Sequence, residues 1–229
     1  MDEKLALVVI GGEKEKLLWE ALSQAGWVEL RIDRFLRDFP ESQLAGWLKR
    51  IKSYTSGKLI ATVRWVKEQS APPYRISEEK RESLFRLVLP EVDYVDLEIR
   101  SNLARKILPL AHQQGKKVIL SYHNFKGFPS VSVLMRLYRK FRFLQGDILK
   151  VAVRVNSPGQ LLNLINFTAC YSQKSSLVIV PMGTSLLERV LPLSFGSLFT
   201  YAGLSQAVAP GQPTFRQWQA LRNLLLTER

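Results

Sequence analysis

Eight short runs of apolar residues recur along the chain, separated by longer stretches in which apolar positions follow helical spacing. Most runs are rich in Val, Ile and Leu at consecutive positions, which is typical of strands covered on both faces in a parallel sheet. The pattern therefore predicts eight strands. They begin near Leu5, Trp27, Lys58, Asp93, Lys117, Asp147, Ser176 and Leu198.

The stretches between the strands predict about eight helices. Ser77 followed by two glutamates is a helix-start signature, and Gly115 is typical of a helix end. Pro192 shortens one of the predicted helices. The helices are expected over residues 13–24, 42–51, 77–89, 101–114, 130–144, 157–168, 184–193 and 214–225.

The alternation of strands and helices predicts an α/β protein, and eight strands are the number that closes a (β/α)8 TIM barrel. The alternative is an open, doubly wound sheet. Against it, the first strand is followed only by the pair Gly11-Gly12 and not by a glycine-rich phosphate turn. The connections are short and include no linker, so we expect a single domain spanning residues 1–229.

The net charge of +13 suggests an anionic partner of some kind. The densest basic run, from Arg136 to Arg142, has the helical spacing of a solvated face, and no helix-turn-helix, finger or RNP motif is present. We therefore expect no nucleic-acid partner. No apolar run approaches the ~20 residues of a membrane span, and Asp2 and Glu3 are unlike the start of a signal peptide. The expected location is cytoplasmic, with no membrane association.

Cysteine and histidine are scarce. One cysteine, Cys170, excludes a disulfide framework and a multi-thiolate zinc site, and we expect it to fill the core. The only histidines are His112, expected on the surface, and His123. Neither a metal nor a cofactor is expected.

Ionisable residues interrupt the apolar strands near their carboxyl ends, where the active site of a TIM barrel lies. Burying so many of them is costly unless they pair or take part in chemistry. One structural explanation is an ion pair of Arg31 with Asp96 or Glu98. The candidate site residues on or just after the strands are Glu29, Arg31, Arg64, His123, Lys150, Arg189 and Gln212.

Lys150 is the most informative of these residues because it lies inside an apolar strand. Such a lysine either reaches outward to water or points into a dry pocket, where its pKa would fall and its amine could attack a carbonyl group to form a Schiff base. A lone lysine in a strand is more often structural. His123 on the neighbouring strand, suited to proton transfer near neutral pH, and Arg64 and Arg189, able to hold an anion, favour catalysis.

Together these residues resemble the type I 3-dehydroquinate dehydratase family. The matching segments run in order through nearly the whole chain, at strand ends or in the loops that follow them. They are Glu29-Leu30-Arg31-Ile32-Asp33, Thr62-Val63-Arg64 with Glu68, Tyr94-Val95-Asp96-Leu97-Glu98, Ser121-Tyr122-His123-Asn124-Phe125, Asp147-Ile148-Leu149-Lys150-Val151-Ala152, Met182-Gly183, Arg189, Phe195-Gly196-Ser197, Thr200-Tyr201 and Ala209-Pro210-Gly211-Gln212.

The resemblance implies a homodimeric TIM barrel, without metal or cofactor, that dehydrates 3-dehydroquinate to 3-dehydroshikimate in the shikimate pathway. It implies that Lys150 forms an imine with the substrate ketone. His123 would remove the adjacent proton, assist imine formation and hydrolysis, and protonate the departing hydroxyl in a syn elimination. Arg189 would clamp the carboxylate, and the other candidates, Glu29, Arg31, Arg64 and Gln212, would hold ring hydroxyls or frame the pocket. Glu68 matches a loop acid near the histidine.

Several positions depart from the family pattern, and each departure alters a polar contact or the local backbone. The family usually has aspartate where Asn124 stands, two glycines where Gln69 and Ser70 stand, and serines where Val8 and Val208 stand. The segment from Met182 to Arg189 is one residue shorter than usual and lacks its customary glycine and serine. We expect weaker substrate contacts from these changes, but the lysine, histidine and arginine all remain.

Two other functions are compatible with the pattern. The first is another Schiff-base barrel enzyme, such as an aldolase. The Glu29-Arg31 pair and the Ala-Pro-Gly-Gln turn argue against it, as does the lack of a convincing glycine-rich phosphate site after the last two strands. The second is a barrel that has lost activity and serves as a binding protein.

Overall fold

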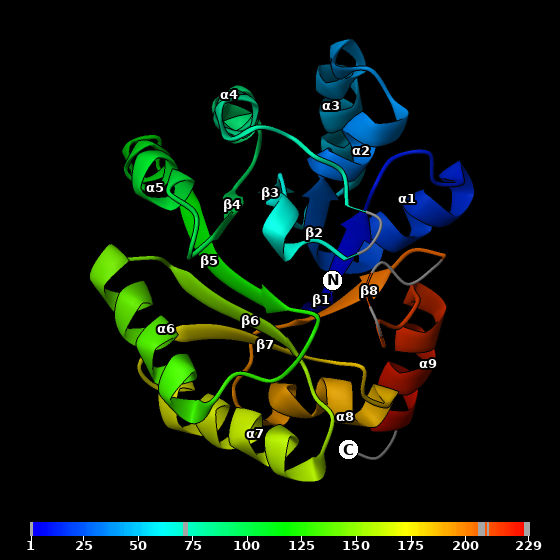
Figure 1. The fold of residues 1–229 in the computed structure, drawn as a ribbon. Helices are drawn as coiled ribbons and strands as arrows, with labels where there is room; N and C mark the ends of the chain where they lie inside the picture. Colours follow the sequence, from blue (N-terminus) through cyan, green and yellow to red (C-terminus); the bar gives the residue numbers. More distant parts are fainter. Residues whose placement is uncertain (1, 71–72, 206–208, 210, 227–229) are drawn as a thin grey trace.

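The computed structural model describes residues 2–70, 73–205, 209 and 211–226, apart from the side chains of residues 224–226. Within these residues, eight parallel strands form one sheet in the order β7-β6-β5-β4-β3-β2-β1-β8. Figure 1 shows the helices arranged around the outside of these strands. The strands are β1 (Asp2–Val9), β2 (Ala25–Arg31), β3 (Lys58–Thr62), β4 (Tyr94–Glu98), β5 (Lys117–Asn124), β6 (Ile148–Arg154), β7 (Ser176–Met182) and β8 (Thr200–Gly203).

The sheet closes on itself where β7 meets the residues that precede β8. Leu177 and Ser197 form a parallel bridge. The backbone N–H of Leu198 donates to the carbonyl of Leu177 at 2.8 Å, and the N–H of Ile179 donates to Oγ of Ser197 at 3.0 Å. The predicted (β/α)8 barrel is confirmed. Among the described residues, its strands β7 and β8 are joined through the single bridge between Leu177 and Ser197, whereas the other neighbouring strands pair over several residues.

The predicted helices are all present among the described residues, with shifted ends. They are α1 (Glu15–Gln24), α3 (Leu44–Tyr54), α4 (Glu78–Val88), α5 (Leu103–Gln113), α6 (Val131–Leu144), α7 (Pro158–Ser172), α8 (Leu186–Val190) and α9 (Phe215–Leu226). The helix predicted over 184–193 is split into α8 and a 3-10 turn, Leu191–Phe195, which contains Pro192. A short helix that the pattern did not predict, α2 (Ile32–Asp38), follows β2.

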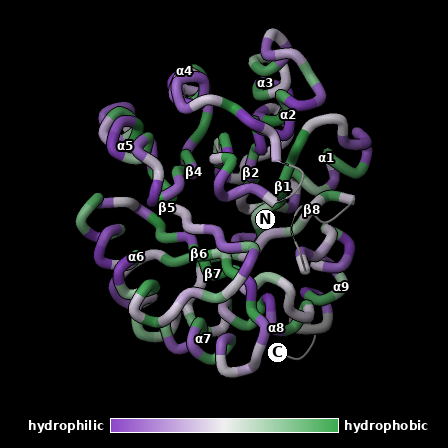
Figure 2. Tube along the Cα trace, in the orientation of Figure 1, coloured by the Kyte–Doolittle hydropathy of each residue, from purple (hydrophilic) through white to green (hydrophobic). Residues whose placement is uncertain are grey.

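Each strand has two buried faces, which explains its nearly continuous apolar sequence. Outward side chains such as Leu7, Leu97 and Val151 are fully buried against the surrounding helices. In Figure 2 these helices carry both green and purple positions, as expected for helices with one apolar face. The covering helices leave the carboxyl ends of the strands to the loops, and those loops build the site.

The lower interior of the barrel is filled by a second apolar cluster. The Trp27 ring centroid lies 4.5 Å from that of Phe199 and 5.0 Å from that of Tyr94. Ile60, Ile119, Ile148 and Val178 are buried in the same cluster. This cluster fills the barrel at the amino ends of the strands. Polar side chains further along the strands are therefore approached from the carboxyl end.

One prediction about the core is wrong, and two about the surface agree with the structure. Cys170 is exposed and does not fill the core, because Phe167 and Thr168 occupy the inner face of α7 at that point. The basic residues between Arg136 and Arg142 are exposed, as expected of a solvated face. His112 is also partly exposed and contacts Asp147 at 2.9 Å. None of the helices in the described parts of the chain is long and apolar enough to span a membrane.

Candidate active site

The inward positions change from apolar to ionisable toward the carboxyl end of each strand. Above Trp27 on β2 lies Glu29, and above Ile148 on β6 lies Lys150, each two residues further along. Since alternate residues of a strand share a face, these side chains stand directly over the apolar cluster. All the predicted site residues line one cavity there: Glu29, Arg31, Arg64, His123, Lys150, Arg189 and Gln212.

Lys150 points into this cavity and is only 4% exposed. Its Nζ donates to Oδ2 of Asp96 at 2.9 Å and to Oε2 of Glu29 at 3.3 Å. The ring centroid of Tyr201 lies 4.2 Å from the same nitrogen. The sequence led us to expect either an outward lysine or one in a dry pocket. The structure places the lysine inward, in the cavity, where two carboxylates balance its charge.

Arg64 anchors the acidic side of the cavity. One of its terminal nitrogens contacts Asp96 Oδ1 at 2.8 Å, Glu98 Oε1 at 3.1 Å and Ser121 Oγ at 2.8 Å. Burial alone would raise the pKa of Asp96, but Arg64 and Lys150 hold that pKa well below its usual range. The carboxylate beside the lysine is therefore ionised.

The proposed ion pair of Arg31 with Asp96 or Glu98 is wrong. Arg31 pairs with Asp33 at 2.8 Å, because Asp33 turns back at the start of α2. The arginine that pairs with Asp96 and Glu98 is Arg64, from the end of the adjacent strand β3.

His123 at the end of β5 is held by Glu68. Oε2 of Glu68 accepts the backbone N–H of His123 at 2.8 Å and lies 3.1 Å from its Nδ1. Oε1 accepts Nε–H of Arg100 at 3.0 Å. Glu68 thus orients the ring, although it was not among the predicted site residues. It lies in the loop after β3, where a charged residue interrupts no apolar strand, so only the family resemblance pointed to it.

Burial and the neighbouring charges set the protonation of this pair. Burial and the Glu98 carboxylate raise the pKa of Glu68 to about 7, although Arg64 and Arg100 oppose the shift. Burial, Arg64 and Lys150 together lower the pKa of His123 well below its usual range. The imidazole is therefore neutral at pH 7, so it can accept a proton, and its pKa is lower than the sequence led us to expect.

Asn124 does not take part in holding His123. Its Oδ1 accepts the backbone N–H groups of Lys126 at 3.1 Å and Gly127 at 3.2 Å. It therefore caps the turn after β5, and the orientation of the imidazole comes from Glu68.

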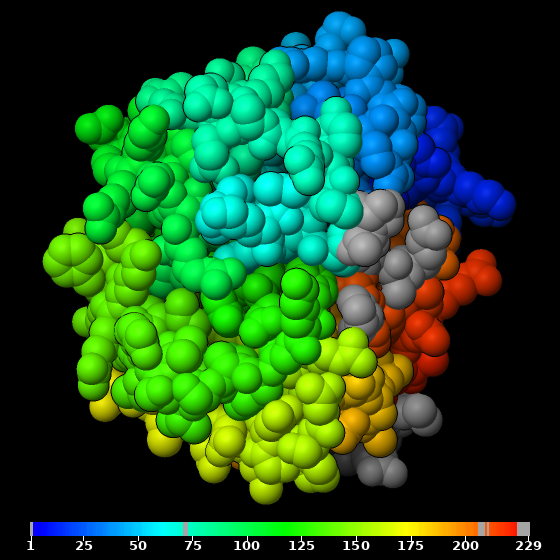
Figure 3. All heavy atoms as spheres, viewed as in Figure 1, coloured from blue at the N-terminus to red at the C-terminus, as the bar shows by residue number. Residues whose placement is uncertain are grey.

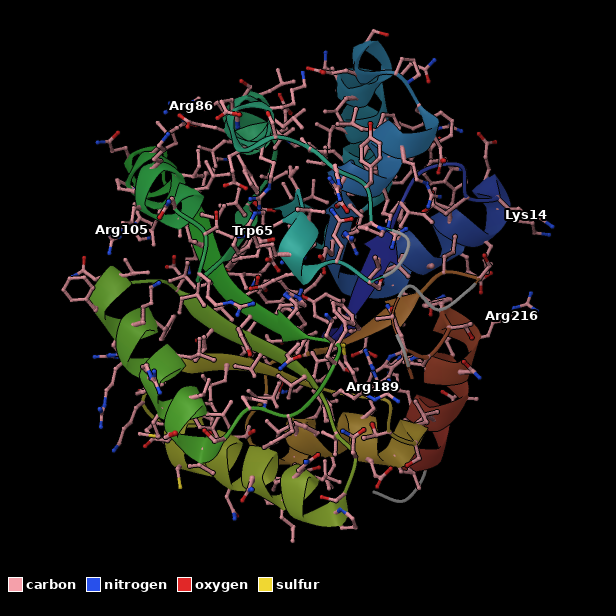
Figure 4. The ribbon with its side chains drawn as sticks, in the orientation of Figure 1. Lys14, Trp65, Arg86, Arg105, Arg189 and Arg216 are labelled. Carbon is pink, nitrogen blue, oxygen red and sulfur yellow. The ribbon has the colours of Figure 1, made fainter. Side chains whose placement is uncertain are left out.

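Arg189 reaches the cavity from the short helix α8. In Figure 4 it extends from that helix toward the middle of the barrel. It is 2% exposed, and burial lowers its pKa to about 10, so it remains positively charged at pH 7. The helix begins with a capping box in which Ser185 and Glu188 bond to each other's backbone N–H. This box supplies local order in a segment that lacks the family's glycine and serine.

Gln212 enters the cavity from a tight turn next to α8. Gly211 adopts φ +70°, and an added Cβ would lie 3.0 Å from the carbonyl of Thr184, so the turn requires glycine. Gln212 itself is buried. Val208, the other departure near this turn, lies outside the described residues. Among the described residues, no group of three or more His, Cys, Asp or Glu side chains is arranged to hold a metal ion.

Comparison with known proteins decides the family. The family model for type I 3-dehydroquinase matches residues 7–228. The chain belongs to the type I 3-dehydroquinase family. As a member it is a 3-dehydroquinate dehydratase, a hydro-lyase, and the predicted enzyme class is confirmed.

Individual members of the family resemble the chain over nearly its full length. The 3-dehydroquinate dehydratase of Thermococcus gammatolerans is 32% identical over 223 residues, which cover 96% of each chain. The crystal structure of the Aquifex aeolicus enzyme has a TM-score of 0.82 at 28% identity and covers 97% of this chain and 98% of its own. That of the Geobacillus kaustophilus enzyme has a TM-score of 0.85 at 23% identity, covering 99% and 92%, and supports the fold.

Proposed function

We propose that this family member dehydrates 3-dehydroquinate to 3-dehydroshikimate through an imine on Lys150, with His123 as the acid and base. The observation that carries the proposal is the position of the two side chains. They face one cavity from the adjacent strands β5 and β6, and the imidazole is neutral. A neutral base beside a buried amine is the arrangement that imine chemistry needs.

The chemistry begins when the Lys150 ammonium passes a proton to the neutral His123 and its amine attacks the ketone to give a carbinolamine. The imidazolium returns that proton to the carbinolamine hydroxyl, which leaves as water, so that a protonated imine and a neutral His123 remain. Because this cation withdraws electrons, His123 can remove the neighbouring C–H proton. The electron pair flows into the imine and gives an enamine. The enamine electrons then form the new C=C bond and restore the protonated imine, while the β-hydroxyl takes the proton from His123 and leaves as water. One group removing the proton and protonating the leaving group gives a syn elimination. Water finally hydrolyses the imine and restores the lysine.

The two carboxylates beside Lys150 have different parts in this sequence. An ammonium has three N–H groups, whereas a protonated imine has one and can keep only one of the two hydrogen bonds. Asp96 holds the shorter of the two bonds, and it also accepts Ser121 Oγ–H at 2.6 Å. We assign the remaining N–H to Asp96. Glu29 is then free to accept a hydroxyl of the bound substrate.

The cationic side chains have two roles: some bind the substrate, and others hold the acidic side chains of the cavity in place. We assign the substrate carboxylate to Arg189, whose guanidinium offers a planar, bidentate set of donors. Arg31 and Gln212 frame the ring hydroxyls. Arg64 is engaged by Asp96, Glu98 and Ser121, and its part is to hold the acidic wall in place.

We further propose that the chain works as a single catalytic domain, in the cytoplasm, as a homodimer. These assignments rest on the short connections seen in the sequence and on the family resemblance. Light scattering on the purified protein tests the dimer, and a mass equal to one chain of 26.2 kDa contradicts it.

Borohydride trapping tests the mechanism. The protein is mixed with 3-dehydroquinate, reduced with borohydride and weighed intact and as peptides. We expect a substrate-sized mass gain on the peptide that contains Lys150, and no gain in the Lys150→Met variant. A folded wild-type protein that turns over substrate without a trapped adduct contradicts the imine. A third outcome is a folded protein that gives neither turnover nor adduct while another family member, tested in parallel, gives both. That result would favour the alternative functions, an aldolase or a binding protein.

A further inference from the structure

Glu68 reaches His123 from the segment between β3 and α4. Its described residues run from Arg64 through the 3-10 turn Val66–Glu68 to Ser70, and resume at residue 73 before α4. In Figure 3 the described atoms of this segment, in cyan, lie over the central part of the face shown. Trp65 is labelled near its start in Figure 4. Gln69 and Ser70 stand here in place of the family's two glycines.

The side-chain amide of Gln69 ties the two ends of this segment together. Its Nε2 donates to the carbonyl of Arg64 and to the carbonyl of Tyr74, each at 2.8 Å. Its Oε1 accepts the backbone N–H of Tyr74 at 2.7 Å. Both N–H groups and the oxygen of the amide are therefore used, all on backbone partners. A pair of glycines has no side chain that could make these bonds.

Further bonds fasten the same segment to α2. Ser70 Oγ accepts from a terminal nitrogen of Arg34 at 3.2 Å. The Tyr74 hydroxyl donates to the carbonyl of Leu36 at 3.3 Å. Two residues that follow Gln69, namely Ser70 and Tyr74, are thus held against α2, in addition to the bonds of Gln69 itself.

Holding Glu68 in place requires such bonds. The carboxylate is 1% exposed, and burial raises its pKa, so its charged form would gain hydration if the segment moved outward. Its contacts with His123 and Arg100 oppose that movement. Because Gln69 is the next residue along the chain, its bonds fix the backbone that carries Glu68.

We propose that Gln69 is a positioning residue, whose bonds to the backbone of Arg64 and Tyr74 hold Glu68 against His123. The proposal rests on the proposed function in one respect, the use of His123 as the base. On this proposal, replacing the family's glycine with Gln69 adds hydrogen bonds that order the backbone, and does not remove a contact with the substrate.

Two variants test the proposal. Gln69→Met keeps the length of the side chain and removes all three bonds, and Gln69→Gly restores the family residue. The control is Gln173→Met, which alters an exposed glutamine beyond α7. Loss of several hydrogen bonds that position a catalytic group lowers kcat on the order of tenfold. We expect that loss in both variants, a KM within about threefold of wild type because Arg189 is untouched, and no change in the control.

The pH profile of kcat distinguishes positioning from simple destabilisation. Because the pKa of Glu68 is about 7, the acidic limb of wild type is expected near pH 7. In the variants Glu68 becomes hydrated, so the limb moves to lower pH. An unchanged kcat and an unchanged limb in folded Gln69→Met overturn the proposal. If borohydride traps nothing on Lys150 in wild type, the failure lies with the proposed function instead.

Hydrogen exchange keeps the test open if the variants do not fold. The Tyr74 amide donates to Gln69 in wild type and is expected to exchange slowly. Rapid exchange of that amide in folded wild-type protein contradicts the tie, whatever the variants do.

Discussion

His123 and Glu68 are chemically opposite partners that meet at 3.1 Å. Burial disfavours the charged form of both, lowering the pKa of the imidazole and raising that of the carboxyl to about 7. At pH 7 the imidazole is therefore neutral, and Glu68 is near the midpoint of its ionisation. When His123 takes a proton, the carboxylate stabilises the imidazolium, which makes the ionisation of Glu68 a condition for proton removal.

This condition predicts a pH dependence. Glu68 has a pKa of about 7, so the active carboxylate form is lost as the pH falls through 7. In wild type kcat is expected to rise between pH 6 and 8 with a midpoint near 7. Glu68→Gln should lower kcat on the order of a hundredfold and remove this limb. Steady-state kinetics from pH 5.5 to 9 measure both, with Glu79→Gln on the exposed face of α4 as the control. A limb at the same pH in Glu68→Gln assigns it to another group.

The sequence identified the site residues on strands better than those in loops. Lys150 and His123 stand out because a charge or an imidazole breaks an apolar run whose faces are both covered. Glu68 lies on a loop, where a charged residue is ordinary, so only the resemblance marked it. The predicted partner of Asp96 or Glu98 was Arg31, and the observed partner is Arg64. The difference arises because Asp33 turns back and pairs with Arg31, and the apolar periodicity does not indicate that turn.

At the scale of elements, α8 positions Arg189 although it is only five residues long. A helix this short is not stable by itself. Its order comes from the Ser185–Glu188 capping box at one end and from the 3-10 turn at the other. The geometry of substrate binding thus depends on a cap rather than on a long framework helix.

Ser185→Ala tests this dependence. It removes the two bonds of the Ser185 hydroxyl, which donates to Oε2 of Glu188 at 2.7 Å and accepts the Glu188 N–H at 3.4 Å. Loss of such an N-cap costs about 1 kcal/mol. Because Arg189 then loses its fixed direction, KM should rise severalfold, within about fivefold, with kcat changed less. Ser157→Ala is the control, since the Ser157 hydroxyl also accepts a backbone N–H, that of Gln160, at the start of α7, a helix that carries none of the predicted site residues. An equal KM in the two variants shows that α8 keeps its shape without the cap.

Arg81 ties another element, α4, to the barrel. It is fully buried and bonds to the carbonyl of Val63 at 2.9 Å, to Glu78 at 2.7 Å and to Glu98. Glu98 is also bonded by Arg64 and by the N–H of Trp65. One buried guanidinium therefore links the helix to the wall of the cavity.

Removing this link should be costly. Arg81→Met leaves Glu98 without one of its two guanidinium partners, and breaking a buried pair destabilises by about 3–5 kcal/mol. Arg86→Met on the same helix breaks an exposed pair with Glu82 and should cost less than about 1 kcal/mol. Urea unfolding of both variants measures the difference. Similar losses would mean that Glu98 is satisfied by Arg64 alone.

The helices and strands were predicted where local pattern decides them. The eight strands and the eight helices between them follow from apolar runs and from start and end signals. The helix α2 was missed because the residues from Ile32 to Asp38 mix buried apolar and buried charged side chains. Asp33 is buried there through its pair with Arg31, a tertiary contact that no local rule anticipates.

At the scale of the molecule, the charge of +13 should guide an anionic substrate to the cavity. Raising the salt concentration from 0.02 to 0.5 M shortens the screening length from about 20 to about 4 Å. We expect kcat/KM to fall severalfold, on the order of fivefold, while kcat stays constant, because Lys150 and Arg189 are buried and less screened. Replacing sodium chloride by choline chloride controls for specific ion effects. A flat kcat/KM shows that the surface charge has no part in substrate capture.

The place of β1 in the barrel has a consequence for biosynthesis. β1 lies between β2 and β8, and Oδ2 of Asp2 accepts Nε1–H of Trp218 in α9 at 2.7 Å. The first strand of the barrel therefore pairs with the last. A ribosome adding 5–20 residues per second needs roughly 10–40 s to pass from β1 to β8. For that time one edge of β1 has no partner strand. The nascent chain can accumulate βα units one after another, but the barrel closes only after β8 emerges, and nascent chains stopped earlier carry an open edge that chaperones or other chains can bind.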